Sequence, residues 1–493
     1  MVLIIGALFQ TGCMRHVNES SLDSHVAPAP DRVWTPPPEA VSGRPAPAKQ
    51  LDIPENLLQP DSKWQLGDII EVALRNNPDT RATWYAARSA AADWLSKKGS
   101  FYPEINAAAG LAHTENLASK KVISAANSDR HINSVESTLG LTWLLLDFGG
   151  RGASIEEKHQ ALLAADFTHN AAIQNAVFLV LQTYFQYANA KALLKASETS
   201  LHEAATNLEA AEQRHRNGLA TIAEVLLAKT ALSQARLNLD VIQGHTQTIR
   251  GALATAMGIP ANTPYDIEDL VLNPPIDRLT DEVDTYIKQA EANRPDLAAQ
   301  RSRVEQSRAR IKTMDSAQYP SLVLSNDFGG TLDSVSDDWI GVNKTALMVK
   351  VPLFKGNSLR YDALKSRQDA EAQKAQLETL GQTIIFQVWS SYFNLKTSAQ
   401  RVKTSEDLLK SALQSYDVSL GRYKEGVGGF LDLLSAQSTL EIARAQQVSA
   451  QTDWYISFAQ LTRDTGMLWR ETPEKQAGVI DIFPTTTIKE RPQ

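Results

Sequence analysis

Residues 422–437 read RYKEGVGGFLDLLSAQ, and residues 214–229 follow the same pattern with RHRNGLATIAEVLLAK. Gly426 stands 208 residues after Gly218, and the acidic and alanine positions that follow keep this separation. In both copies a glycine-containing turn separates two long segments rich in Ala, Gln and Leu. Because glycine permits the positive φ at which a helical hairpin reverses, the pattern predicts a duplicated helical hairpin. The predicted turn residues are Gly218, Gly426, Gly428 and Gly429.

The longest predicted elements are two helices of about 64 residues, 151–214 and 359–422, neither of which contains Pro. A helix of that length extends on the order of 95 Å, more than the core of a globular domain spans. The return helices, about 222–256 and 430–465, are shorter, so a second short helix is expected beside each long one. Their apolar residues recur with 3,4 spacing and include many Ala, which indicates close packing on a partner helix.

Between the short and the long helices of each copy, the periodicity of apolar residues changes from helical to two-residue. This alternation predicts two β-hairpins, at about 102–147 and 319–354. Strands of about ten residues cross a bilayer when tilted, with apolar side chains outward. The alternative is a soluble sheet packed on the helices. Four strands cannot close a barrel without free edges, so a membrane-spanning barrel requires several chains, and three copies give twelve strands.

Composition limits the functions that the chain can have. It has 493 residues and a formal net charge of −7 with no clustered basic face, so nucleic acid is not an expected partner. Its nine His residues lack metal-ligand spacing, and its six Met residues do not cluster. GGRG at 149–152 and GVGG at 426–429 lack the strand-turn-helix setting of a phosphate loop. The sequence therefore predicts neither an enzyme nor a cofactor or metal site.

The N-terminal segment contains the only cysteine, Cys13, directly after the apolar run MVLIIGALFQTG. This run is too short to span a bilayer but suits the apolar region of a signal peptide. LFQTGC resembles a bacterial lipobox, in which the cysteine is lipidated, although Gln10 departs from that pattern and no Lys or Arg precedes the run. We therefore expect residues 1–13 to be a lipoprotein signal with its lipidation site at Cys13. Nine Pro residues before Ser62 predict that residues 14–63 form an extended arm.

The two copies together resemble the TolC-like outer membrane factors, the exit ducts of tripartite efflux pumps and type I secretion systems. The resemblance covers 64–467 and rests on the order and duplication of NNPD, YP, LLLDFGG and the two hairpin sequences. It implies a mainly helical fold with a transmembrane β-barrel contribution: a homotrimer with a twelve-stranded barrel in the outer membrane and a helical barrel in the periplasm. The implied parts are a first repeat at 64–258, an equatorial linker at 259–281, a second repeat at 282–467 and a C-terminal tail at 468–493.

The resemblance also implies the partners of the chain. An outer membrane channel of this family accepts substrates from a periplasmic adaptor and an inner-membrane pump, of the resistance-nodulation-division or ABC type. The lipobox and Pro-rich arm resemble the lipoprotein branch, which favours small-molecule efflux over secretion and places the chain in the outer membrane, lipid-anchored, with a long periplasmic extension. Two alternatives are a soluble periplasmic coiled-coil scaffold, which leaves the alternating strands unexplained, and an adaptor protein, which predicts one hairpin instead of two.

In the resembling family, polar links between the hairpins hold the periplasmic end of the helical barrel shut. By this resemblance, Tyr423 matches the tip tyrosine, Glu224 the acidic residue that bonds it, and Asp432 a carboxylate that rings the narrowed lumen. Gly428 stands where the family has a linking arginine, and Ser435 where it has a second ring carboxylate. The alternative interpretation is that Tyr423 only packs and that the two acidic residues cap helices.

Overall fold

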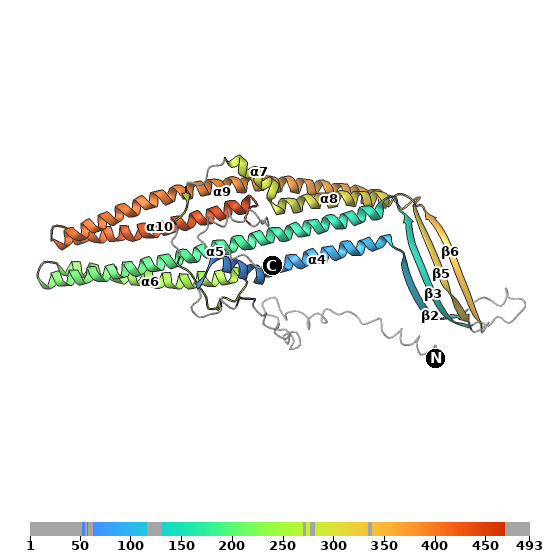
Figure 1. Cartoon of the computed structure of the whole chain (residues 1–493), viewed down its shortest axis with the longest axis horizontal. Coiled ribbons are helices and arrows are strands. Elements are labelled where there is room, and N and C mark those ends of the chain that lie inside the picture. Colours follow the sequence, from blue (N-terminus) through green and yellow to red (C-terminus); the bar gives the residue numbers. More distant parts are fainter. Residues whose placement is uncertain are drawn as a thin grey trace, which may run out of the picture. The chain divides into compact units, whose positions relative to one another are not determined.

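The computed structural model describes residues 52–54, 57, 63–115, 131–269, 273–276, 282–333 and 338–468. The predicted signal with Cys13, most of the predicted Pro-rich arm and all but the first residue of the predicted tail lie outside these ranges. The described chain is mostly helical, with a four-stranded and a two-stranded sheet (Figure 1). This composition of elements agrees with the mainly helical fold expected from the sequence.

Two helical hairpins make up most of the described chain (Figure 1). Their helices are α5 (Gly150–Arg216) with α6 (Ile222–Ala256), and α9 (Ser358–Lys424) with α10 (Phe430–Asp464). α5 and α9 have 67 residues each, about 100 Å of helix. Every bound in the second hairpin lies 208 residues after its counterpart in the first, which confirms the predicted duplication. Within the described ranges, no helix combines the length and the apolarity that a membrane span requires.

Each copy also has two shorter helices ahead of its strands. They are α3 (Leu66–Asn76), α4 (Pro78–Lys98), α7 (Val283–Asn293) and α8 (Pro295–Ser316). α4 packs on α5, and α8 packs on both α5 and α9. The Asn77 side chain caps α4 because its Oδ1 accepts from the amides of Asp79 at 2.8 Å and Thr80 at 3.2 Å. Together with Pro78 at the first helical position, this cap explains the break between α3 and α4.

Four antiparallel strands pair in the order β2-β3-β5-β6 (Figure 1). Their bounds are Glu104–Glu115 for β2, His131–Leu146 for β3, Ser321–Asp333 for β5 and Trp339–Lys350 for β6. Both predicted hairpins are present, and pairing between β3 and β5 joins them into one sheet. β2 and β6 form the edges, and neither pairs with a further strand among the described residues.

The register separates an apolar from a polar face of the sheet, because directly opposite residues point to the same side. The apolar face carries Ile105, Leu111, Val135, Leu139, Leu141, Trp143, Leu324, Phe328, Leu332, Leu347 and Val349. The polar face carries Glu104, Asn106, Glu136, Thr138, Thr142, Ser325, Asp327, Thr331, Lys344 and Lys350, with Leu144, Val323, Ile340, Val342 and Met348 as apolar exceptions. Polar exceptions on the apolar face include Asn326, Asn343 and Thr345. The predicted two-residue alternation is thus confirmed for most positions of the sheet.

The segment that follows α6 is anchored on the long helix α5. Its short strand β4 (Asp266–Ile267) pairs in parallel with β1 (Lys63–Trp64). Lys191 Nζ in α5 lies 3.0 Å from Asp266 Oδ2 and 2.8 Å from Asp269 Oδ1. Burial acts to lower the pKa of Lys191, but hydrogen bonds to Asp269 and Asp266 outweigh it and raise this pKa. The start of the predicted equatorial linker is therefore held by ion pairs to α5.

Two equivalent glycines end the return helices at crowded positions. Gly258 and Gly466 have φ of 73° and 75°, and a Cβ at Gly258 would lie 2.7 Å from the carbonyl oxygen of Asn76. We expect Gly258→Ala to lower the free energy of unfolding by about 2–4 kcal/mol, because alanine disfavours left-handed backbone and its methyl group would displace the chain at Asn76. Thermal unfolding followed by circular dichroism measures the change.

Gly244→Ala is the matched control for this substitution. Gly244 lies inside α6, and a Cβ there would meet open space. This variant is expected to gain about 0.5–1 kcal/mol, because alanine loses less backbone entropy in a helix than glycine does. Equal unfolding midpoints for the two variants would contradict the close approach described at Gly258.

Candidate functional site at the hairpin tips

The two hairpin turns adopt the same backbone conformation. Gly218 follows α5 with φ of 73°, and Gly426 follows α9 with φ of 76°. In each turn the next amide donates to the carbonyl oxygen five residues earlier, at 2.8 Å for Arg214 O and 3.0 Å for Arg422 O. Such a helix end requires a residue that tolerates positive φ. The chain therefore reverses at the two glycines that the sequence pattern predicts.

Gly428 and Gly429 also lie in the second turn, but for different reasons. Gly429 has φ of −79° and is the residue before α10, where it offers no capping side chain. A Cβ at Gly428 would lie only 2.9 Å from the Cβ of Arg422, because the turn folds back on the last turn of α9. An arginine at position 428 would therefore have to displace that helical turn. Glycine at position 428 therefore allows the turn to approach the end of α9 closely.

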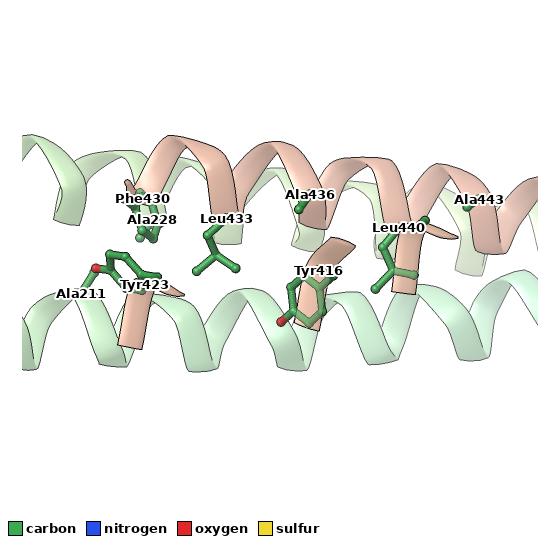
Figure 2. Packing of buried hydrophobic residues seen from close by; sticks show 10 residues of the cluster. Ala211, Ala228, Tyr416, Tyr423, Phe430, Leu433, Ala436, Leu440 and Ala443 are labelled. Carbon is green, nitrogen blue, oxygen red and sulfur yellow. The ribbon is translucent and has the colours of Figure 1, made fainter. Parts of the chain in front are cut away.

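Buried side chains from α5, α6, α9 and α10 meet beside the turns (Figure 2). This set, the tip cluster, comprises Ala211, Ala228, Ala412, Tyr416, Tyr423, Phe430, Leu433, Ala436, Leu440 and Ala443. The Tyr423 side chain is 2% exposed, and the centre of its ring lies 5.3 Å from that of Phe430. The alanines allow the helices to approach closely. Tyr423 thus packs inside the tip cluster.

Arg214 connects the first hairpin to the second at the tips. Its Nη1 donates to Tyr423 O at 2.8 Å, and its Cζ lies 4.7 Å from the centre of the Tyr423 ring. The arginine therefore makes a charge-assisted hydrogen bond and a cation–π contact with the same residue. Sequence reasoning missed Arg214, because Arg422 occupies the equivalent position in the second copy and the two share their local pattern. Only the packing of the hairpins distinguishes them.

The hydroxyl of Tyr423 and the carboxylate of Glu224 lie close enough to interact, but not in the geometry of a full hydrogen bond. Burial, and then the negative charge of Glu224, raise the pKa of Tyr423 above its ordinary value. The buried hydroxyl has no hydrogen-bond partner within the described residues. Glu224 Oε1 instead accepts from the Thr221 amide at 3.3 Å, and the Glu224 amide donates to Thr221 Oγ1 at 3.3 Å. In this conformation Glu224 caps α6.

Asp432 lies in the first turn of α10, apart from the tip cluster. Its side chain is exposed, and a Cβ at Gly429 would lie 3.5 Å from its Oδ2. A carboxylate in this position is stabilised by the positive end of the helix dipole. Ser435, one turn further along, is also exposed. The structure therefore brings Tyr423 and Glu224 together at the tips and leaves Asp432 facing solvent.

Polar contacts between α5 and α10 continue away from the tips. The guanidinium of Arg444 binds both carboxylate oxygens of Glu203 at 3.0 Å. Nearer the tip, Asn207 Nδ2 donates to Gln437 Oε1 at 2.8 Å, and both side chains are buried. These bonds and Arg214 hold the two hairpins of one chain together. No group of three or more His, Cys, Asp or Glu side chains in the described part of the chain is arranged to hold a metal ion.

Comparison with known proteins identifies the family of the chain. The model of the family described as outer membrane efflux protein matches residues 69–259 and 286–467. Protein CyaE of Bordetella pertussis is 26% identical over 456 residues, which cover 90% of this chain and 92% of that protein. Outer membrane protein TolC of Escherichia coli is 22% identical, with 84% of this chain and 83% of that protein covered.

A solved structure shares the fold. The outer membrane protein VceC of Vibrio cholerae superimposes with a TM-score of 0.72 at 20% identity, covering 82% of this chain and 96% of that chain. The chain therefore belongs to the outer membrane efflux protein family, and it is a non-enzymatic outer membrane channel that forms the exit duct of an efflux or secretion system.

Proposed function

We propose that the channel is a homotrimer in which three copies of the four-stranded sheet close a twelve-stranded barrel. The sheet itself carries the proposal, because it has one apolar face, one polar face and two edges that pair with no further strand in the described residues. Unpaired edge groups are costly in hydrocarbon, and pairing β6 of one copy with β2 of the next removes them. The apolar face then contacts lipid, and the polar face lines the lumen.

In this proposal the long hairpins continue the duct into the periplasm, where the adaptor and the inner-membrane pump deliver substrates. Residues 64–258 and 282–467 act as equivalent repeats joined by the linker 259–281, and the arm at 14–63 runs from the lipid anchor to the first repeat. The lipobox-like segment favours small-molecule efflux through a resistance-nodulation-division pump. An ABC exporter is the second candidate pump, because the family serves secretion systems as well.

Reconstitution of the purified full-length protein tests the channel proposal. Chemical crosslinking in detergent is expected to give a trimer as the largest product. The same material in a planar lipid bilayer is expected to produce stepwise increases in conductance. A protein that remains monomeric in the soluble periplasmic fraction would refute the proposal and favour the scaffold alternative.

The proposed lipid anchor at Cys13 gives a separate prediction. Cys13→Ser should abolish incorporation of labelled palmitate, because a hydroxyl does not replace the thiol in lipidation. Trimer formation and channel activity should persist, because one or two acyl chains add only a modest share of the membrane affinity of a closed barrel. Metabolic labelling and crosslinking of the same membrane fraction measure both properties. Loss of all trimer in this variant would show that the anchor is needed for assembly.

We also propose that the hairpin tips form the periplasmic gate, with Tyr423 and Glu224 between hairpins and Asp432 facing the lumen. Asp432→Ala is expected to raise the half-blocking concentration of a trivalent cation at least fivefold, because two unit charges about 4 Å apart in water interact by about 1 kcal/mol and a trivalent cation is attracted more strongly. Block of single channels by hexaamminecobalt measures the effect. Asp240→Ala removes the same charge from α6 well away from the turn and should leave block unchanged. Equal block in all three proteins would remove Asp432 from the gate.

A further inference from the structure

A cavity of about 370 Å³ lies where the sheet meets the helices. Its walls come from the ends of α4 and α8, the start of α5, and the adjoining ends of β5 and β6. Four of its lining residues are basic and one is acidic, although the chain as a whole has a net charge of −7. The basic residues are Lys97, Arg151, Lys350 and Lys355, and the acidic residue is Asp147.

Arg151 and Asp147 are occupied by each other and by the backbone. The backbone amide of Arg151 donates to Asp147 Oδ2 at 2.6 Å, and the side-chain Nε of Arg151 lies 3.5 Å from Asp147 Oδ1. The other guanidinium nitrogens donate to Leu145 O at 3.0 Å and Ser100 O at 3.4 Å. Asp147 therefore caps α5, and Arg151 ties the helix to the chain on both sides. Neither group is available to neutralise the lysines.

The three lysines are the uncompensated charges of the cavity. Lys97, Lys350 and Lys355 form no ion pair or side-chain hydrogen bond with the described residues. Hydroxyl groups of Ser154, Thr313, Ser316 and Ser321 line the same space. Those of Thr313 and Ser316 already donate to the carbonyl oxygens of Ala309 and Thr313, so Ser154 and Ser321 supply the further donors. Three ammonium groups with hydroxyl donors form a site suited to a carboxylate, phosphate or sulfate group.

Gly150 keeps this space open. A Cβ at position 150 would collide with Ser316 Oγ and would lie 3.1 Å from Asp147 Oδ2. The residue is the first of α5, and its amide already donates to Asp147 O at 3.2 Å. The first two backbone amides of α5 therefore already have acceptors on Asp147. Any ligand in the cavity would be held by the lysines and hydroxyls.

The register of the sheet shows on which side the cavity opens. Lys350 pairs directly with Ser321, and both residues belong to the polar face. In the proposed trimer this face lines the lumen, so the cavity opens to the channel and away from lipid. Threefold symmetry would place nine lysines at one level of the duct. A ring of that charge concentrates anions locally.

We infer that this cavity is an anion-binding site in the lumen, which binds the carboxylate, phosphate or sulfate group of molecules that pass through the duct. The inference rests on the proposed trimeric channel and names a substrate class that the site favours, small molecules bearing such groups. The lysines draw the anionic group to the junction of barrel and helices.

Block of single channels by pyrophosphate tests this inference. The variant carries Lys97→Gln, Lys350→Gln and Lys355→Gln, which remove charge from exposed or half-buried side chains without removing core packing. We expect its half-blocking concentration to rise about tenfold or more, and its anion-to-cation permeability ratio in a KCl gradient to fall. The corresponding triple Lys→Arg variant keeps the charge and should keep both properties.

A second triple variant controls for net charge. Lys288→Gln, Lys396→Gln and Lys410→Gln change exposed lysines that do not line the cavity, and block should remain as in the unmodified channel. Equal effects of the two Gln variants would overturn the inference, as would channels whose block does not change. Loss of copurified phospholipid with unchanged block would overturn it in favour of lipid phosphate binding. Failure of the unmodified protein to form any channel would instead refute the proposed function, and the inference with it.

Discussion

Arg214→Ala is expected to raise the open probability of the reconstituted channel about 30-fold, if the gate lies at the hairpin tips as proposed. The substitution removes the hydrogen bond from Nη1 to Tyr423 O, at 2.8 Å, and the contact between the guanidinium and the Tyr423 ring. A hydrogen bond to a charged group contributes about 1.5–3 kcal/mol, and about 2 kcal/mol corresponds to a 30-fold change in an equilibrium constant. Long single-channel recordings at low voltage measure this probability.

Arg216→Ala is the control for the loss of charge at the same helix end. Its side chain is 65% exposed and lies 3.9 Å from Glu212 in the same helix, so no contact between hairpins is lost. This variant should gate as the unmodified channel does. If both arginine variants raise the open probability equally, the effect comes from the charge at the tip. The contact of Arg214 with Tyr423 then does not hold the gate closed.

The double variant Tyr423→Phe with Glu224→Gln distinguishes two contacts that could hold the gate closed. One is the contact of Arg214 with Tyr423 in this structure, and the other is the bond between Tyr423 and Glu224 that the family resemblance implies. The Tyr423 hydroxyl has no hydrogen-bond partner among the described residues, and Glu224 is engaged by Thr221. We therefore expect this variant to raise open probability less than Arg214→Ala does. A larger effect of the double variant would mean that the closed channel contains a bond between Tyr423 and Glu224 that this conformation lacks.

The helices and strands were predictable from the sequence because local rules and the duplication agree. Long segments without Pro, ended by glycine turns, predict helices at 151–214 and 359–422, and the structure has them at Gly150–Arg216 and Ser358–Lys424. The alternation of apolar residues predicts the strands of both β-hairpins. Each rule involves residues close in sequence, and the second copy provides an independent instance of the first.

The contacts between hairpins were not predictable, because the duplication makes the two copies locally alike. Arg214 and Arg422 both precede a glycine turn, yet only Arg214 contacts the opposite hairpin. The sequence also does not predict that the lysines of the cavity lie together. Lys97 and Lys355 are far apart in sequence, and the residues around each predict only an ordinary solvated charge. They form one site only because the ends of five helices and strands meet there.

Leu141→Arg is expected to destabilise the inserted barrel by about 2–4 kcal/mol, the cost of arginine on the lipid face at mid-membrane. Leu141 lies on the apolar face, opposite Ile105 and Asn326. Asn326 also hydrogen-bonds to Asn343 at 2.9 Å, so a polar side chain already lies at this level. An arginine at position 141 can donate to the side-chain oxygen of Asn326, the residue opposite it. The expected cost is therefore at the lower end of the range, about 2 kcal/mol.

Arginine at two further positions serves as a comparison for Leu141→Arg. Thr142 lies opposite Glu104 and Ser325 on the polar face, so Thr142→Arg should cost little. Val349 is the last residue but one of β6, and Val349→Arg should cost about 0–1 kcal/mol, because an arginine near the membrane surface reaches water. Urea titration of the protein folded into phosphatidylcholine vesicles measures the three free energies. Equal costs at 141 and 142 would be incompatible with an apolar face in lipid, since neighbouring residues of one strand must then experience the same surroundings.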